Sequence, residues 1–529
     1  MSAGLRSAPG RTLPDDVRHL LDDALEVYRD VPAAVARLRA SRERMDEPLR
    51  VALAGRVKAG KSTLLNALVG ERIAPTDAGE CTRVVTWYRR GPVPRVVLHG
   101  VDGAHRPLPV RRVRGELRLE LADAAVDQVE RLVVDWPAAG LGTATLIDTP
   151  GISSLSVENS ARTEAFIDAG DQVSGADAVL FLTRQFQPAD LSFLAAVQQA
   201  CGGLATTTLS VLSRADDAGG GQVDALIAAG QLARRTAEQP AVRALSANVL
   251  PVAGLMALGG RTLRHSDFVA FRALARADRA DVETMLLTAD RFRRPAVPVD
   301  LSAEVRVGLV ERFGLFGIRM AVALLRTGVG DAPALADQLV ARSGLGELQR
   351  LLAVQFTERG DQLKAATAMR LLERLLRERP VSGDAALWAG LERARTASLD
   401  LMELDLLART RSSDGPFPPD VREDAERLLG AHGSGFAARL GLGPEATPAE
   451  LRAAAVASLE RWQAHAADPL ARRATVDAAE LLVQEAETLL LELSADEGRA
   501  DEDRADADSA PVADEDGAPV AGGSSGGLA

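Results

Sequence analysis

Gly55-Arg-Val-Lys-Ala-Gly-Lys61-Ser62 is the stretch that decides the fold of this 529-residue chain. It matches the pattern G-x-x-x-x-G-K-[S/T], follows the apolar run 50–54 and precedes the helical run 63–69. A glycine-rich turn between a strand and a helix presents backbone N–H groups to phosphates, and the helix N-terminus adds its dipole. The predicted phosphate-binding residues are Gly55, Lys58, Ala59, Gly60, Lys61, Ser62 and Thr63.

Two side chains of this motif carry the predicted chemistry. Lys61 is predicted to reach the β- and γ-phosphates as a catalytic residue, and the Ser62 hydroxyl is predicted to ligate Mg²⁺. A chance glycine-rich turn is the competing interpretation, and the strand and helix on either side disfavour it. The chain is therefore predicted to bind a nucleoside triphosphate with Mg²⁺.

A second motif, Asp148-Thr-Pro-Gly151, follows the apolar run 144–147. Asp148 is predicted to hold Mg²⁺ through water, and the Gly151 amide is predicted to sense the γ-phosphate. Taken alone, D-x-P-G is a common turn. Its place after an apolar strand and downstream of a P-loop favours the metal site over the simple turn.

A threonine between these two motifs is predicted to complete the magnesium site. Thr82 lies twenty residues after Ser62, in the loop 76–82, where its hydroxyl and carbonyl can close on the metal. It is therefore also a predicted catalytic residue. Thr76 and Thr86 are rival candidates, and an ordinary loop threonine is the alternative interpretation.

Ser213-Arg-Ala-Asp216 follows the apolar run 207–212 and is predicted to recognise the base. The Asp216 carboxylate can accept two hydrogen bonds from guanine, which adenine does not offer, and the Arg214 stem can stack on the base. A polar strand end is the competing interpretation for Ser213 and its neighbours. The aspartate favours GTP over ATP.

A backbone contact to the guanine oxygen is expected after the last predicted strand. Ala253, in the segment Val252-Ala-Gly254, is the predicted residue, and Ser246-Ala247 is the rival.

Short apolar runs alternate with helical stretches from residue 49 on, which predicts an α/β fold with a mostly parallel sheet. Strand signals nearly vanish after about residue 254, and long helical patterns follow. No uninterrupted apolar stretch reaches ~18 residues, so no transmembrane helix is expected. The predicted strands are 50–54, 84–88, 95–99, 132–135, 144–147, 178–182, 207–212 and 250–252.

Charge and cysteine content exclude several classes of protein. The net charge is −12, but ten acidic residues and two arginines lie from Asp496 onward, so the rest of the chain is nearly balanced. This balance gives no support to a nucleic-acid partner. The two cysteines, Cys81 and Cys201, exclude a disulfide framework and favour a reducing cytoplasm.

Together these residues resemble the dynamin-like GTPases, in particular the actinobacterial isoniazid-inducible dynamin-like proteins. The similarity runs from about residue 15 to 490. Its most specific parts are Ser213–Asp216, which keeps the aspartate of the usual Asn-Lys-x-Asp, and Phe313-Gly-Leu-Phe-Gly317. The segments that carry it are 53–70, 74–77, 82–87, 213–216 and 311–318.

The resemblance implies an α/β P-loop GTPase head with an extended, all-helical neck and trunk whose tip meets lipid. The neck is expected to combine 15–45 with 472–493, and lipid contact is expected around 380–420. The expected divisions are a disordered N-terminus (1–14), an N-terminal neck helix (15–48), a GTPase domain (49–360, core 49–260), a helical neck and trunk (361–495), and a disordered acidic and Gly-Ser tail (496–529).

The implied activity is hydrolysis of GTP with Mg²⁺, with slow basal turnover. Nucleotide-dependent dimerisation of heads is expected to drive helical levers for membrane remodelling or maintenance. The expected partners are a second copy, a sibling dynamin-like protein and peripherally bound lipid. The expected location is the cytoplasm or the inner face of the plasma membrane. The alternatives are a regulatory or scaffolding GTPase that acts on a protein partner, and a nucleotide-binding protein with little catalysis.

Two catalytic devices of related GTPases are absent. Ile152 stands where Ras-like enzymes carry a glutamine, and Val57 and Lys58 stand where eukaryotic dynamins carry a glutamine and a cation-binding serine. Our hypothesis is that Lys58 supplies positive charge near the β–γ bridge when heads dimerise. A cationic group of this type contributes ~10³–10⁵ in rate. The alternative is that Lys58 is solvated and inert.

Overall fold

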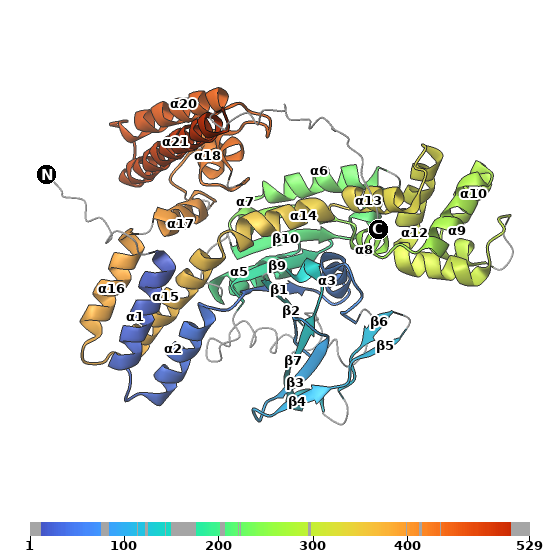
Figure 1. Cartoon of the computed structure of the whole chain (residues 1–529), viewed down its shortest axis with the longest axis horizontal. Coiled ribbons are helices and arrows are strands. Elements are labelled where there is room, and N and C mark those ends of the chain that lie inside the picture. Colours follow the sequence, from blue (N-terminus) through green and yellow to red (C-terminus); the bar gives the residue numbers. More distant parts are fainter. Residues whose placement is uncertain are drawn as a thin grey trace, which may run out of the picture. The chain divides into compact units, whose positions relative to one another are not determined.

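The structure, a computed structural model, forms two compact units, Met1–Ser434 and Gly435–Ala529. Figure 1 shows the helices and strands of both units. The structure describes residues 12–75, 84–113, 115–121, 125–142, 144–149, 176–200, 207–220, 222, 224–294, 298–397, 399–411, 415–433 and 435–508.

Unit 1 is built on a nine-stranded sheet of order β11-β10-β9-β1-β8-β2-β7-β3-β4 (Figure 1). Five of its eight strand pairings are parallel, so the predicted mostly parallel α/β fold is confirmed. Its strands are β1 (Leu49–Gly55), β2 (Thr86–Arg90), β3 (Arg95–Gly100), β4 (His105–Leu108), β7 (Val129–Trp136), β8 (Ala144–Asp148), β9 (Ala178–Thr183), β10 (Thr208–Ser213) and β11 (Asn248–Val252).

Three short strands were not expected from the sequence. One is β4, at the edge of the large sheet, and the others are β5 (Arg111–Val113) and β6 (Glu116–Arg118), which form a separate antiparallel pair. Most of their residues are polar and exposed. Such strands lack the alternation of apolar and polar residues on which the prediction depends.

Helices cover both faces of the sheet, and β1 shows why. Val51 and Leu53 belong to the core beneath α3 (Lys61–Val69), α8 (Gly254–Arg261) and α14 (Leu345–Leu352). Ala52 and Ala54 face the opposite side, which is covered in part by α5 (Pro188–Ala200). A parallel strand buried on both faces reads as a continuous apolar run, which is how β1 was found in the sequence.

A second apolar core lies among the helices that follow β11. Its longest helix, α12 (Ala303–Arg326), is broken at Gly314, where φ is +66°. Phe313 beside this break packs edge-to-face on Phe271, with ring centroids 4.9 Å apart. The other helices of this region and of the sheet edge are α6 (Ala225–Ala237), α7 (Pro240–Arg243), α9 (His265–Arg276), α10 (Arg279–Met285), α11 (Ala289–Arg293) and α13 (Ala332–Arg342).

Four helices form a bundle beside the head, which we call the neck. They are α1 (Leu13–Val27), α2 (Pro32–Arg44), α15 (Gly360–Glu378) and α16 (Asp384–Ala397). The neck segment expected over 15–48 forms two helices, since Pro32 splits the helical run, as a proline inside such a pattern predicts, and begins the second helix. The described partners of α1 and α2 are α15 and α16, whereas the segment 472–493 belongs to unit 2.

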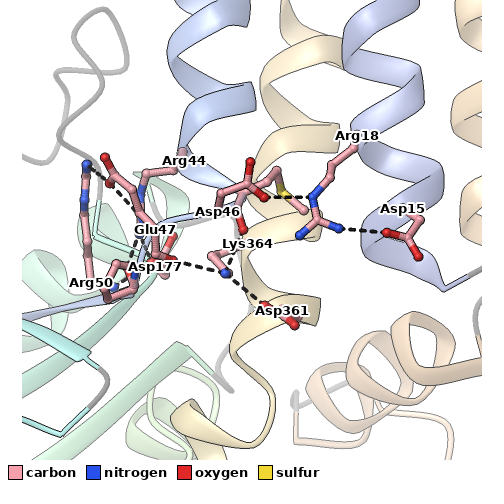
Figure 2. Close-up of polar contacts among 11 residues, drawn as sticks. Asp15, Arg18, Arg44, Asp46, Glu47, Arg50, Asp177, Asp361 and Lys364 are labelled. Atoms are coloured by element: carbon pink, nitrogen blue, oxygen red, sulfur yellow. Dashed lines mark hydrogen bonds and ion pairs between the residues drawn. The ribbon is translucent and has the colours of Figure 1, made fainter.

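A buried carboxylate joins the neck to the head (Figure 2). Asp177, 1% exposed, accepts hydrogen bonds from the Arg50 backbone N–H at 2.7 Å and from the Arg44 guanidinium. Burial raises the pKa of Asp177, and the charge of Arg44 opposes this shift. From α15, Lys364 donates to two backbone carbonyls of the linker 45–47, at 2.9 and 3.1 Å. The linker is therefore fixed on both sides.

The described residues of the stretch 380–420 pack on the neck and head, and the lipid contact expected around this stretch stays a prediction. Its helix α16 lies in the neck core, and α17 (Leu399–Arg411) ends at a buried arginine. Arg411 donates to the carbonyls of Ser246 and Ala247 and pairs with Glu426 of α18 (Pro419–Leu428) at 3.3 Å. This stretch is therefore not a free end in the structure.

Unit 2 contains α19 (Phe436–Leu440), α20 (Pro448–Ala466) and α21 (Arg473–Asp508). The last two helices pack on each other around the buried Trp462, and Arg439 pairs with the buried Glu485. Helix α21 continues to Asp508, past residue 496, where a disordered tail was expected to begin. None of the helices in the described parts of the chain combines the length and hydropathy needed to cross a bilayer.

Candidate nucleotide site

The loop between β1 and α3 requires its two glycines. Gly55 has a φ of +146°, and a Cβ atom there would lie 2.2 Å from the Leu182 carbonyl oxygen. Gly60, at the start of α3, has a φ of +95°. Lys58 is also left-handed, with a φ of +62°, and its side chain is exposed. The loop is thus a tight turn whose backbone only glycine fits at both ends.

Lys61 is buried within this loop. Its Nζ donates to the carbonyl oxygens of Gly55 at 3.0 Å and Arg56 at 3.3 Å. Burial lowers the pKa of Lys61, while the charge of Asp148 opposes that shift. The ammonium group is therefore held against the loop backbone, at the position that the motif assigns to it.

Ser62 and Asp148 meet beside Lys61. The Ser62 hydroxyl donates to Asp148 Oδ2 at 2.8 Å. Asp148 ends β8, next to Leu53 of β1 in the parallel register. Its Oδ1 atom is buried without a hydrogen-bond partner among the described residues, and burial raises its pKa against the opposing charge of Lys61.

This oxygen pair fits Mg²⁺. A hydroxyl and a carboxylate are hard oxygen ligands, and Mg²⁺ in phosphate sites keeps several waters and takes few protein ligands. Within the described ranges no three His, Cys, Asp or Glu side chains gather as a metal-binding group. The buried, unpartnered Oδ1 atom of Asp148 is the observation that most favours a cation or its water at this place.

The predicted base-recognition segment turns out of β10. Ser213 Oγ donates to the Thr183 carbonyl at 3.2 Å, and Arg214 has a φ of +53°. Asp216 follows in the 3₁₀ turn η5 (Ala215–Gly220). Burial raises the pKa of Asp216, and the neighbouring Asp217 charge acts in the same direction.

One cleft of about 680 Å³ joins the two segments. Ala59, Gly60 and Thr63 line it from the P-loop, and Ser213, Arg214 and Asp216 line it from the strand end. The cleft lies at the carboxyl ends of the parallel strands β1, β9, β10 and β11. That is where open α/β sheets bind their ligands.

Helix α12 forms one wall of this cleft, and the sequence did not predict this role for the helix. Val310, Gly314, Leu315, Phe316 and Arg319 line the cleft beside Gly254. The signal was present, because Phe313-Gly-Leu-Phe-Gly317 is one of the most specific segments of the resemblance. Nothing in the spacing of these residues linked them to the P-loop.

The backbone N–H of Ala253, which was predicted to contact the guanine oxygen, is already used in another hydrogen bond. The Ala253 N–H donates to the Ser343 carbonyl at 2.9 Å, and the residue is fully buried. Its neighbours Val252 and Gly254 line the cleft instead. The rival pair Ser246-Ala247 precedes β11. It therefore lies at the amino ends of the parallel strands, whereas the P-loop lies at their carboxyl ends.

Thr82, its rival Thr76, and Gly151 lie outside the described residues. The other rival, Thr86, is buried on β2 opposite Asp148 in the antiparallel register, and its hydroxyl donates to the Val84 carbonyl at 3.3 Å.

Sequence reasoning missed Asn66, which organises the segment before loop 76–83. Its side chain accepts from the N–H groups of Ile73 and Ala74 at 2.8 and 2.7 Å, and donates to the Ala74 carbonyl. The side chain is fully buried. A polar residue in the apolar run of α3 was the available signal.

A sheet covered by helices on both faces, a P-loop at its switch point and a partly buried aspartate at the next strand end define a P-loop nucleotide-binding protein of the GTPase type. The dynamin family model matches residues 51–213. Isoniazid-induced protein IniC of Mycobacterium tuberculosis is 40% identical over 489 residues, which are 91% of this chain and 99% of that protein. The chain therefore belongs to the dynamin family of GTPases, and the predicted resemblance is confirmed.

Two further relatives match shorter stretches. Isoniazid-induced protein IniA of Mycobacterium tuberculosis is 31% identical over 205 residues, 36% of this chain and 31% of that protein. A bacterial dynamin-like protein of Nostoc punctiforme is 31% identical over 163 residues, 29% of this chain and 22% of that protein. A solved structure of an oligomerised bacterial dynamin pair covers 94% of this chain and 77% of its own at 13% identity. Its TM-score of 0.34 is too low to carry a structural argument.

Proposed function

We propose that this chain binds GTP with Mg²⁺ and hydrolyses it slowly. The observation that carries the proposal is the single cleft in which the P-loop meets the segment Ser213–Asp216. The family and the partly buried Ser62–Asp148 pair support the same interpretation.

Each residue has a separate task in this proposal. Lys61 reaches the β- and γ-phosphates, and the backbone N–H groups of the loop hold them. Ser62 would bind Mg²⁺ through its hydroxyl and Asp148 through water, and the bound ion would neutralise charge on the phosphate oxygens. Asp216 accepts hydrogen bonds from the donor edge of guanine. Thr82 and Gly151 complete the set from outside the described residues.

Head dimerisation is the step that we propose for accelerating turnover. The side chain of Lys58 is exposed, which leaves it open to contact by a second head. Its ammonium group would then stabilise charge near the β–γ bridge. The neck, anchored to the head through Asp177, would transmit the resulting movement to the remaining helices. Membrane remodelling at the inner face is the proposed outcome, and a partner protein in place of lipid is the alternative.

Turnover measured against protein concentration tests the enzymatic part of the proposal. We expect specific activity to rise with concentration, because a dimer places Lys58 at the nucleotide. Lys61→Ala should abolish GTP hydrolysis, whereas Arg95→Ala, at an exposed arginine on β3, should leave it unchanged. A specific activity that is constant over a hundredfold range of concentration would contradict dimer-driven hydrolysis.

The role of Lys58 is tested by Lys58→Ala. We expect an unchanged affinity for GTP and loss of the concentration-dependent acceleration. Unchanged turnover with unchanged affinity would show that Lys58 is inert. Lys58→Arg is the matched variant, since it keeps the positive charge and should keep part of the acceleration.

Co-sedimentation with liposomes separates the two proposed outcomes. Binding of the full chain to vesicles, increased by a slowly hydrolysed GTP analogue, is expected for a membrane-remodelling protein. Pelleting that does not change with vesicles or nucleotide would favour the scaffolding alternative.

A further inference from the structure

A second cleft, of about 710 Å³, lies between the neck and the head and shares no lining residue with the nucleotide cleft. Neck helices α2 and α15 line one side of it, with Arg37 on α2 and Arg379 directly after α15. Strands β1, β2 and β7 line the other side, with Arg50, Trp87 and Arg131. The proposed GTPase reaction uses none of the residues that line this cleft.

The lining of this cleft, which we call the junction cleft, has an excess of positive charge. Four arginines face two glutamates, Glu47 and Glu130. Both carboxylates are already engaged, because Glu47 accepts from Arg50 at 2.6 Å and Glu130 pairs with Arg131. Of the other two arginines, Arg37 pairs with Glu378 outside the lining at 3.6 Å, so the lining arginines exceed their paired carboxylates by one, the exposed Arg379.

Burial disfavours the charge of Arg50, and the carboxylates of Glu47 and Asp177 offset part of that cost. Arg50 is 5% exposed. Burial lowers its pKa to about 10, and the charge of Arg44 acts in the same direction, against the opposing charge of Glu47. A guanidinium group in such surroundings is stabilised by any further anion that reaches it.

Trp87 lines the head side of the junction cleft together with Arg50 and Arg131. The guanidinium carbons of Arg50 and Arg131 lie 4.4 and 4.7 Å from its ring centroid. The ring is 7% exposed, and its Nε1 atom is buried without a hydrogen-bond partner among the described residues, as is Nε of Arg131. Both atoms are donors only, so an acceptor is what this site lacks.

We propose that the junction cleft binds a phosphate-bearing anion. Phosphate offers acceptor oxygens and no obligatory donor, and its geometry matches the fork of a guanidinium group. Arg37 and Arg379 contact it from the neck, and Arg131 and the Trp87 indole N–H contact it from the head. The source is either a free phosphate compound or the headgroup of a phospholipid.

An anion in this position contacts both parts of unit 1 at once. It therefore favours the arrangement in which α2 and α15 lie against the sheet, in addition to the contacts that Asp177 makes. Binding at the junction cleft is predicted to stabilise the neck on the head, whatever nucleotide the first cleft holds.

Inorganic phosphate is the probe for the experiment. The full chain is first saturated with a slowly hydrolysed GTP analogue and Mg²⁺, so that the P-loop cannot take phosphate. Phosphate is then titrated against chloride of equal ionic strength, with tryptophan fluorescence and calorimetry as the two readouts. We expect a saturable fluorescence change that Trp87→Phe removes.

Three variants define the site. Arg131→Gln removes one guanidinium group. Ala36→Glu adds a carboxylate at an exposed position of the cleft wall and leaves the packing of α2 intact. Arg95→Gln is the control, an exposed arginine outside the cleft. We expect phosphate to bind at least tenfold more weakly to the first two variants and equally to the wild type and Arg95→Gln.

The proposal is overturned if the wild type shows no saturable response, or if Ala36→Glu binds phosphate as the wild type does. Vesicles of phosphatidylcholine with and without phosphatidic acid identify the source. Binding that requires phosphatidic acid, is weakened by Ala36→Glu and is competed by phosphate assigns the site to a headgroup. Phosphate binding without such vesicle binding assigns it to a free phosphate compound.

Discussion

At the scale of single residues, the nucleotide cleft brings together groups whose charges are disfavoured by burial. Lys61 has a lowered pKa and Asp148 a raised one, each for the reason that its charged form is poorly solvated. Their mutual attraction opposes both shifts. Pairs of groups with pKa values shifted in this way are typical of functional sites, because a bound ligand stabilises charges that water does not reach.

Asp216→Asn is predicted to exchange guanine for xanthine as the preferred base. The asparagine amide would place a donor against the exocyclic amino group of guanine, whereas xanthine carries a carbonyl oxygen there. We expect kcat/KM for GTP to fall at least about 100-fold and that for XTP to rise. Steady-state rates with GTP, XTP and ATP measure this.

Asp217→Asn, a change at the neighbouring aspartate of the same turn, is the control for the base exchange. An equal loss of GTP turnover in both variants, without any gain for XTP, would show that Asp216 does not recognise the base.

His99 on β3 is predicted to make stability depend on pH. Burial, together with the charge of Arg131, lowers the pKa of His99 to about 4. The unfolded chain therefore takes up this proton first, near the ordinary histidine pKa of about 6.5. The contribution of the neutral imidazole is fully present above about pH 6.5 and is lost as the pH falls from there to about 4.

His99→Gln should reduce the loss of thermal stability between pH 7.5 and pH 5, since glutamine does not titrate. Melting temperatures at the two pH values measure the effect. His19→Gln, at an exposed position of α1, should lose as much stability as the wild type. Equal losses in all three proteins would contradict the assignment to His99.

At the scale of elements, a small number of buried polar contacts hold the neck helices against the head. Asp177→Ala would leave Arg44 and the Arg50 N–H without their acceptor. Removing one partner of a buried ion pair lowers the free energy of unfolding by about 3–5 kcal/mol. We expect a loss of this size in the free energy of unfolding, measured by denaturant titration.

Asp361→Ala is the matched control at the same junction. Its carboxylate pairs with Lys364 at 2.9 Å but is 67% exposed. Lys364 is itself buried but keeps its two carbonyl acceptors, and solvent screens a pair with one exposed partner, so this variant should lose clearly less stability than Asp177→Ala. If the two variants lose stability equally, burial of Asp177 is not what anchors the neck.

The sequence was informative about elements wherever the signal is local. The P-loop, the strand before Asp148 and the strand before Ser213 each lie where their own residues predicted, because a buried parallel strand needs only a short apolar run. The α12 wall depends on tertiary packing and was not predicted. Ala253 failed for a similar reason, since its N–H is used by Ser343, 90 residues away in the sequence.

At the scale of the whole molecule, the nucleotide cleft lies entirely within unit 1. A chain that ends at Gly433 is therefore predicted to fold and to bind nucleotide with an affinity within about twofold of that of the full chain. Titration with a fluorescent GDP analogue measures this. A folded truncation whose affinity is more than tenfold weaker would show that unit 2 contributes to binding.

The break at Gly314 has a consequence for chemical selectivity. It turns Leu315 and Phe316 into the nucleotide cleft, and both residues lie outside the segment 51–213 that the dynamin family model matches. A guanine analogue could carry an apolar substituent that contacts Leu315 and Phe316. Its selectivity among dynamin relatives would then depend on these two residues and not on the P-loop that the relatives share. The same glycine, left-handed at +66°, resists replacement by any larger residue, so resistance to such an inhibitor would have to arise elsewhere.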